Sequence, residues 1–249
     1  MYNVTESTEN KDLLSGETLI QARKRYMDKV KGFNPHLPAP IIEPYEDKMV
    51  LRADLSPAGL KAWGAEQLVS QIKEDTLVYV APRTGHAPHA IVKLAQMYGK
   101  KVVLFCPASK CVSNHQAAML AYDNVELRFI RIAAMPVLNK YAREWAERNG
   151  GKFLPFGLTG TPLVTAGLVR AFVYTGKFPE ATVCAVSTGT MIRALQIAWP
   201  DAVHYGVAVA RNMHDGEIGA AKVWSSHQAF QQKAHVQPPF PSTATYDAK

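Results

Sequence analysis

The chain has 249 residues, of which 47% are hydrophobic and 20% are charged, and its formal net charge is +7. This length and composition suffice for one sizeable core or two small lobes in contact, which excludes a disordered chain. No apolar run is long enough to span a bilayer, and residues 1–6 lack the pattern of a signal peptide. We therefore expect a cytoplasmic protein with no membrane partner.

The first fifty residues carry few signals of regular structure. Residues 1–16 are polar, and we expect them to be disordered or loosely attached. The spacing of apolar residues predicts an amphipathic surface helix over residues 18–30. The run 33–40 contains three prolines, which remove amide donors and restrict the preceding residues, so it cannot be regular. Residues 49–52 are a short strand candidate.

From residue 61 onward, helical patterns alternate with apolar strand patterns. Helices are predicted at 61–73, 88–98, 113–122, 138–149, 162–174 and 191–198. Strands are predicted at 77–81, 101–106, 125–130, 181–186 and 204–210, with a short extended piece at 153–156. This alternation predicts an α/β fold whose parallel sheets are wound by right-handed crossovers. In such folds, ligands bind beyond the carboxyl ends of the strands, where loops lead into helices.

Neither the cysteines nor the basic residues indicate a specific site. Cys106 and Cys111 are too far apart for Cys-x-x-Cys chemistry, Cys184 stands alone, and no cluster has zinc spacing. We therefore predict no metal site. The basic residues are scattered, and no nucleic-acid-binding motif is present, so we interpret the positive charge as a solvated face that attracts anions.

A lysine at the start of a predicted helix is the first candidate for chemistry. Lys61 follows the turn 54–60, and a lysine amine can form a Schiff base with an aldehyde. Burial and nearby cations would lower its pKa toward a useful value. Among 28 lysines and arginines, such a residue is ordinary by itself, so its interpretation depends on the turns that follow.

Two turns after predicted strands have compositions that suit a ligand. Residues 83–86, Arg-Thr-Gly-His, follow the strand 77–81, and His86 could hydrogen-bond a phenolic oxygen. Residues 187–190, Ser-Thr-Gly-Thr, offer three hydroxyls, a glycine and helix N-terminal amides to a phosphate. The second turn is neither a Walker loop nor the dinucleotide glycine fingerprint. An ordinary helix cap remains an alternative for each turn.

Two further segments complete a possible pyridoxal phosphate (PLP) site. The glycine–threonine loop 156–162 could line the substrate side or be a flexible turn. In the tail, Asp247 could lie near a pyridine nitrogen and keep it protonated, although a disordered terminus is the alternative. A reactive lysine, a polar turn beside an aromatic ring and a hydroxyl-rich turn for phosphate are the parts that a PLP site needs.

In their order, these segments resemble the fold type II PLP enzymes, the tryptophan synthase β-subunit superfamily, from about Met49 onward. The branch that the chain resembles most is that of aminocyclopropane-carboxylate deaminase and D-cysteine desulfhydrase. The similar segments are 51–61 (Arg-x-Asp-Leu and Gly-Gly-x-Lys), 84–104 (the Ser-x-Asn turn, helix and strand), 187–190 (the phosphate turn) and 245–249 (Tyr-Glu-Gly-Lys). His86 replaces the family's asparagine, Leu60 replaces a small polar residue, and the phosphate turn has one glycine. These departures concern the substrate more than the cofactor.

The resemblance implies two α/β lobes with parallel sheets flanked by helices and a cofactor crevice between the lobes. Residues 1–48 would form an N-terminal segment with a surface helix and a proline-rich linker. Residues 62–158 would form the smaller lobe, and residues 49–61 with 159–249 the larger lobe. Relatives usually form dimers, which implies a homodimer.

The resemblance also assigns roles to individual residues. Lys61 would form the Schiff base and then act as the base at the substrate Cα, with Tyr246 near the substrate. The cofactor contacts would be made by Lys61, Thr84, Gly85, His86, Ser187, Thr188, Gly189, Thr190 and Asp247.

We therefore expect a PLP-dependent enzyme that acts at Cα or Cβ of a small amino acid, by lyase, deaminase or β-replacement chemistry. Two alternatives stay open. The positive charge and the family departures would suit a PLP enzyme acting on an amino acid attached to nucleic acid, as in viral DNA base hypermodification. The atypical His86 would suit a PLP fold that has lost catalysis and serves as a binding module. A plain nucleotide-binding Rossmann protein is disfavoured, because its glycine fingerprint is absent.

Overall fold

The computed structural model describes residues 4–7, 9–131, 134–214, 216–230 and 232–249. The described residues divide into two compact units: Met1–Ser56 with Gly160–Lys249 form unit 1, and Pro57–Thr159 forms unit 2. Each unit has a four-stranded sheet in which the central strands are parallel and helices pack on the sheet. This confirms the predicted α/β class with parallel sheets.

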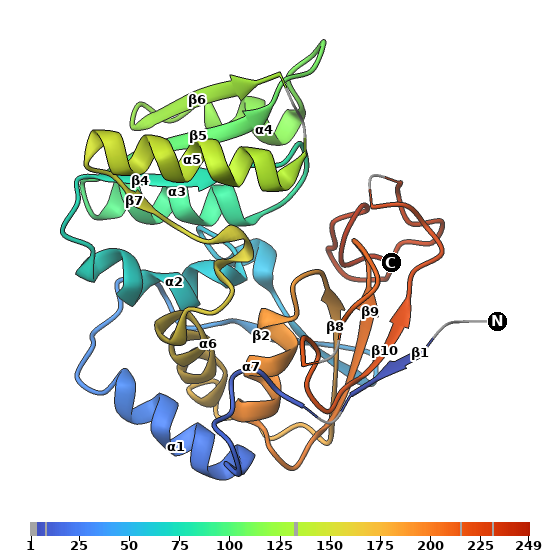
Figure 1. The fold of residues 1–249 in the computed structure, drawn as a ribbon. Coiled ribbons are helices and arrows are strands. Elements are labelled where there is room, and N and C mark those ends of the chain that lie inside the picture. The colour runs from blue at the N-terminus through green and yellow to red at the C-terminus, as the bar shows by residue number, and fades with distance from the viewer. Residues whose placement is uncertain (1–3, 8, 132–133, 215, 231) are drawn as a thin grey trace. The chain divides into compact units, whose positions relative to one another are not determined.

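Unit 2 is a parallel sheet with helices on both faces (Figure 1). The strand order is β6-β5-β4-β7, and the strands are β4 (Thr76–Val80), β5 (Lys101–Pro107), β6 (Val125–Ile130) and β7 (Lys152–Phe153). The helices are α2 (Leu60–Gln71), α3 (Ala87–Met97), α4 (Asn114–Met119) and α5 (Met135–Asn149). The α5 helix packs its buried Leu138, Ala142 and Ala146 on one face of the sheet.

The central strands of unit 2 are apolar along their whole length because both of their faces are covered. Residues 77–80 of β4 and 102–107 of β5 are all buried. Val78, Val80 and Val103 point toward α5, whereas α3 packs against the other face and contacts α2. A continuous apolar run of this kind is typical of a parallel strand between two helical layers.

Unit 1 is a second sheet, with the strand order β1-β10-β9-β8. The strands β8 (Ala181–Val186), β9 (Val203–Ala208) and β10 (Lys222–Ser225) are parallel, and β1 (Val4–Glu6) pairs antiparallel with β10. The helices are α1 (Leu19–Lys29), α6 (Pro162–Val173) and α7 (Thr190–Ala198). The α7 helix packs on β8 and β9, and α1 packs on α6 and α7.

Short elements connect these layers. The strands β2 (Ile42–Tyr45) and β3 (Lys48–Leu51) form a separate antiparallel hairpin in unit 1. Two 3₁₀ turns, η1 (Ala53–Leu55) and η2 (Phe156–Leu158), belong to units 1 and 2 respectively. Thr18 and Ser113 start α1 and α4 with capping boxes, in which each hydroxyl accepts from the N–H three residues later.

The prediction that residues 1–16 are disordered or loosely attached is wrong for the described part of that segment. The edge strand β1 pairs with β10, Asn10 is buried, and the Asp12 carboxylate forms an ion pair with Arg193. Polar composition indicated a loose segment, but these polar groups have partners far along the chain that composition cannot reveal. Residues 1–3 and 8 of the segment lie outside the described residues.

The observed units differ from the predicted lobes at two boundaries. Lys61 falls in unit 2, not with residues 159–249, because it belongs to α2, and α2 packs against α3. The described part of residues 1–48 belongs to unit 1, because β1 and α1 pack on elements from the second half of the chain.

Candidate functional site

Lys61 lies in the first turn of α2, and its amine is desolvated. Gly59 precedes the helix with a φ of +72°, a backbone conformation that favours glycine. The Lys61 Nζ donates a hydrogen bond of 3.1 Å to the carbonyl oxygen of Gly157. Burial lowers the pKa of Lys61 to about 8. At pH 7 about one amine in ten is then neutral, compared with fewer than about one in a thousand for an ordinary lysine, which suits a nucleophile.

The loop whose Gly157 carbonyl accepts the Lys61 hydrogen bond is held in place by a buried tyrosine. The hydroxyl oxygen of Tyr79 on β4 accepts a hydrogen bond of 2.8 Å from the Gly157 N–H. The Tyr79 ring stacks on Phe156, with ring centroids 6.3 Å apart. Leu158 has a φ of +58°, which is uncommon for a side chain of this kind. Residues 156–158 therefore form a support for Lys61 that is held by contacts to β4.

The turn 83–86 joins β4 to α3 in unit 2, as expected. Gly85 has a φ of +142°, Thr84 is partly buried, and His86 occupies the N-cap position of α3. The His86 side chain is exposed, and its ring lies 5.4 Å from that of His115 in an edge-to-face contact. The guanidinium of Arg83 contacts the Ser109 hydroxyl, so the turn is joined to the loop after β5.

The turn 187–190 joins β8 to α7 in unit 1, and its backbone is tightly constrained. Gly189 is the N-cap of α7 with a φ of +73°, and a Cβ at this position would overlap the carbonyl oxygen of Glu217. The hydroxyls of Thr188 and Thr190 lie 3.3 Å apart. The first N–H groups of α7 have no partner within their own helix, and helix N-termini of this kind, with hydroxyls beside them, suit anions in general.

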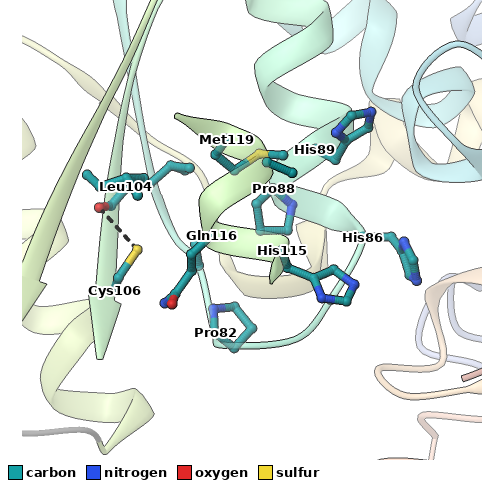
Figure 2. Close-up of a pocket in the computed structure, with 13 residues that line it drawn as sticks. Pro82, His86, Pro88, His89, Leu104, Cys106, His115, Gln116 and Met119 are labelled. Carbon is teal, nitrogen blue, oxygen red and sulfur yellow. Dashed lines mark hydrogen bonds between the residues drawn. The ribbon is translucent and has the colours of Figure 1, made fainter. Parts of the chain in front are cut away.

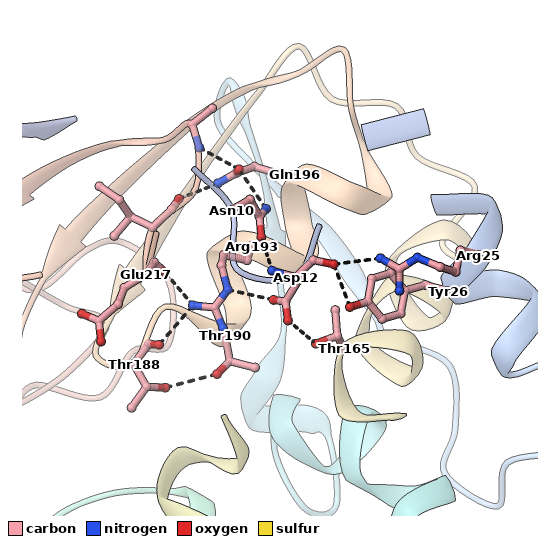
Figure 3. A network of polar contacts seen from close by, with 12 residues as sticks. Asn10, Asp12, Arg25, Tyr26, Thr165, Thr188, Thr190, Arg193, Gln196 and Glu217 are labelled. Atoms are coloured by element: carbon pink, nitrogen blue, oxygen red, sulfur yellow. Dashed lines mark hydrogen bonds and ion pairs between the residues drawn. The ribbon is translucent and has the colours of Figure 1, made fainter. Parts of the chain in front are cut away.

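A buried ion pair supports this turn from within unit 1 (Figure 3). The Arg193 Nε donates to the Asp12 carboxylate over 2.7 Å, and Arg193 is 3% exposed. The Arg193 Nη1 donates to the carbonyl oxygens of Glu217, at 2.6 Å, and Thr188, at 3.4 Å. The guanidinium therefore connects the turn to the 217–218 segment, while Asp12 compensates its buried charge.

Sequence reasoning missed both partners of this ion pair. Asp12 also accepts a hydrogen bond from the Thr165 hydroxyl, and its main-chain carbonyl accepts from Arg25 and Tyr26. Arg193 sits three residues after Thr190, so a basic residue facing back toward the turn was the only local signal. Nothing in the sequence around Asp12, which is 181 positions away, indicates the contact.

The two tail residues of the predicted site behave differently. Tyr246 packs edge-to-face on Phe230, and burial with nearby Cys184 and Asp247 raises its pKa, so its hydroxyl stays protonated. The structure thus brings Tyr246 near β8, which leads into the turn 187–190. Asp247 is exposed, and its carboxylate accepts a hydrogen bond of 2.6 Å from the Thr243 N–H.

Each unit therefore contains one part of the predicted set. Unit 2 contains Lys61 and the turn 83–86, and unit 1 contains the turn 187–190, Tyr246 and Asp247. Within the described ranges, no three or more His, Cys, Asp and Glu side chains are grouped to hold a metal ion. In the same part of the chain, no helix combines the length and apolarity needed to cross a membrane.

Comparison with known proteins gives a match in structure but not in sequence. No protein-family model and no curated protein sequence matches the chain. A solved structure of an ACC deaminase homologue matches with a TM-score of 0.68 and 19% identity, over 84% of this chain and 79% of that one. Escherichia coli diaminopropionate ammonia lyase matches with a TM-score of 0.58 and 14% identity, over 90% of this chain and 74% of that one.

The threonine deaminase of T.th. matches with a TM-score of 0.56 and 20% identity, over 76% of this chain. The chain spans 63% of the length of that enzyme. A further match, also E. coli diaminopropionate ammonia lyase, is in complex with an aminoacrylate-PLP azomethine reaction intermediate. The chain therefore has the type II fold of PLP enzymes, which confirms the fold implied by the sequence resemblance.

Proposed function

We propose that this chain, with its fold type II architecture, is a PLP-dependent enzyme that acts on a small amino acid. The observation that carries the proposal is the Lys61 amine, which is desolvated, has a pKa of about 8 and is positioned by the Gly157 carbonyl. A lysine that served only stability would gain nothing from burial, because burial disfavours its charged form. A nucleophilic lysine gains a larger neutral fraction.

The residues present fit the cofactor at two of its groups. PLP, when bound, supplies an electron sink for bond breaking at the Cα of an amino acid. Lys61 offers the amine that binds its aldehyde carbon, and the turn of Ser187, Thr188, Gly189 and Thr190 offers hydroxyls and α7 N–H groups to its phosphate. The constraint on Gly189 keeps these N–H groups in place before any ligand arrives.

The remaining site residues follow from the same proposal. Thr84, Gly85 and His86 would contact the ring oxygen or the substrate carboxylate, and Tyr246 would lie near the substrate. Lys61 would also move the proton at the substrate Cα. Asp247 would face the pyridine nitrogen, a role supported by the resemblance alone, because the structure places its carboxylate on the Thr243 N–H.

The reaction class is elimination, deamination or β-replacement at Cα or Cβ. It is supported by the ammonia lyase and deaminases that share the fold. A screen should measure ammonia and keto acid released from 2,3-diaminopropionate, threonine, serine and aminocyclopropane carboxylate. Turnover of a nucleotide-linked amino acid alone would favour the nucleic-acid alternative, and a colourless protein that takes up no added cofactor would favour the binding module. We also propose a homodimer, which light scattering on the purified protein tests.

The decisive experiment is an absorbance spectrum of the purified protein with added PLP, before and after borohydride, followed by peptide mapping. We expect a visible band and a reduced adduct on the peptide that contains Lys61. Lys61→Ala should abolish both, whereas Lys24→Ala, at an exposed lysine on α1, should change neither. An adduct on another lysine, or full turnover by Lys61→Ala, would overturn the assignment.

A further inference from the structure

A pocket of about 250 Å³ lies within unit 2, between β5, α3 and α4 (Figure 2). Most of its wall is apolar, with Leu104 and Cys106 from β5, Leu127 from β6 and Met119 from α4. Its polar lining consists of the side chains of His86, His89, His115 and Gln116. None of its 13 lining residues is acidic. The pocket contains neither Lys61 nor the turn 187–190, but it shares Gly85 and His86 with the turn 83–86, which the proposed function assigns to the cofactor or substrate. Its ligand is therefore argued from Gln116, His89 and His115, which have no role in the proposed function.

The amide of Gln116 is the feature that calls for a ligand. Gln116 is 2% exposed, and its Oε1 accepts hydrogen bonds of 3.1 Å from both the N–H and the hydroxyl of Ser113. Its Nε2 has no nitrogen or oxygen partner among the described residues, and the Cys106 thiol, which interacts with it, is only a weak acceptor. Figure 2 shows the amide on the side of α4 that faces Cys106, and both residues line the pocket. A buried NH₂ group whose two hydrogens meet only a weak thiol acceptor costs stability unless something in the pocket accepts them.

The histidine side chains that line the pocket supply further hydrogen-bond donors. The His115 ring, from the residue before Gln116, meets the His86 ring edge-to-face. Burial, and then nearby Lys93 and His115, lowers the pKa of His89, so this ring is neutral at pH 7 and has one N–H to donate. Since every ionisable group near His89 that shifts its pKa is basic, the surroundings favour an acceptor that carries negative charge.

We propose that this pocket binds a small organic carboxylate with an apolar body, about the size of benzoate. The carboxylate oxygens accept hydrogen bonds from Gln116 Nε2 and an imidazole, and the body packs on Leu104, Met119 and Leu127. The volume fits, because a cavity of about 150 Å³ already holds a benzene ring. Such a ligand completes the hydrogen bonding of Gln116, which neither an empty pocket nor an apolar ligand does.

The test is a titration of the full chain with benzoate, followed by the side-chain NH₂ resonances in ¹H–¹⁵N NMR spectra. The pair that disappears in Gln116→Glu identifies Gln116. This substitution keeps the oxygen that Ser113 needs for the α4 cap and replaces the NH₂ donor by an acceptor. We expect the Gln116 pair to shift saturably in the wild type, and benzyl alcohol, a neutral molecule of similar size, to bind at least about tenfold more weakly.

Gln116→Glu should weaken benzoate binding by at least about tenfold, since a carboxylate then faces a carboxylate. The matched control is Gln96→Glu, on the exposed face of α3, which should leave the dissociation constant unchanged. Equal affinity in Gln116→Glu and wild type, or no saturable shift of the Gln116 pair, would overturn the proposal. If Gln116→Glu does not fold, triple-resonance spectra of the wild type assign the Gln116 pair, and the wild-type titration then decides alone.

Discussion

At the scale of single residues, the protonation of Lys61 links stability to function. An amine with a folded-state pKa of about 8 and an unfolded pKa of about 10.4 binds fewer protons when folded. Stability therefore rises with pH between about 8 and 10.4, and below this window the buried cation destabilises the fold at a constant cost. Lys61 thus lowers the free energy of unfolding of the protein at neutral pH, a cost that is common where a side chain serves a reaction.

Because the lowered pKa of Lys61 costs stability at neutral pH, we expect Lys61→Met to raise the free energy of unfolding at pH 7 by about 1–3 kcal/mol. Above about pH 10.5 the substitution should no longer stabilise the protein. Urea unfolding at the two pH values measures the difference. In the wild type, the rate of PLP attachment should rise with pH and level off about one unit above pH 8, because the neutral amine is the nucleophile. A destabilised Lys61→Met at pH 7 would show that the amine is not desolvated.

Gly189 is the second residue with a clear expected outcome. An alanine would place its Cβ on the Glu217 carbonyl and would also have to adopt a positive φ. We expect Gly189→Ala to cost more than about 2 kcal/mol and to weaken PLP binding. The matched control is Gly160→Ala, which has a φ of +66° but open space around the added Cβ, and should cost about 1 kcal/mol. Equal costs in urea unfolding would contradict the role of the close contact.

At the scale of elements, the segment around Asp12 and the helix α7 form one support for the turn 187–190. Arg193 is buried and Asp12 is partly buried, with side-chain exposures of 4% for Arg193 and 10% for Asp12. Removing the carboxylate leaves an uncompensated guanidinium beside the Thr188 and Glu217 carbonyls.

We therefore expect Asp12→Asn to lower the free energy of unfolding by about 3 kcal/mol and to weaken PLP binding, because the turn loses its fixed position. Asp28→Asn, on the exposed surface of α1, should change the free energy by less than about 0.5 kcal/mol. If Asp12→Asn altered stability but left PLP affinity unchanged, the ion pair would support the fold and not the turn.

At the scale of the whole molecule, bound PLP should stabilise the chain by mass action. At a free concentration of 100 times the dissociation constant the gain is about 2.7 kcal/mol. Differential scanning calorimetry should show a higher melting temperature with PLP than without it in the wild type. Lys61→Ala should lose most of this increase, and an equal increase in both proteins would place the cofactor elsewhere.

The sequence predicted those parts of the molecule that local patterns encode. The alternation of apolar runs predicted the central strands β4, β5, β8 and β9 and the long helices, because each buries a regular face. It did not predict β1, β2 or β10, which are short and are defined by their partners, as Val4 is by Trp224. Lys61 was proposed from the order of the motifs. The Gly157 carbonyl, Asp12 and Arg193 were missed, because contacts between distant segments leave no periodic signal.

The division of the chain has a consequence for how the protein folds during synthesis. Unit 2 is one continuous segment, Pro57–Thr159, so all of its strands are available once that segment has left the ribosome. Unit 1 combines both ends of the chain. Val4 can pair with Trp224, and Asp12 with Arg193, only after these later residues have been synthesised. Closing such long loops is slow, so we expect unit 2 to fold during translation while β1 still lacks its partner strand β10 and α1 still lacks α6 and α7.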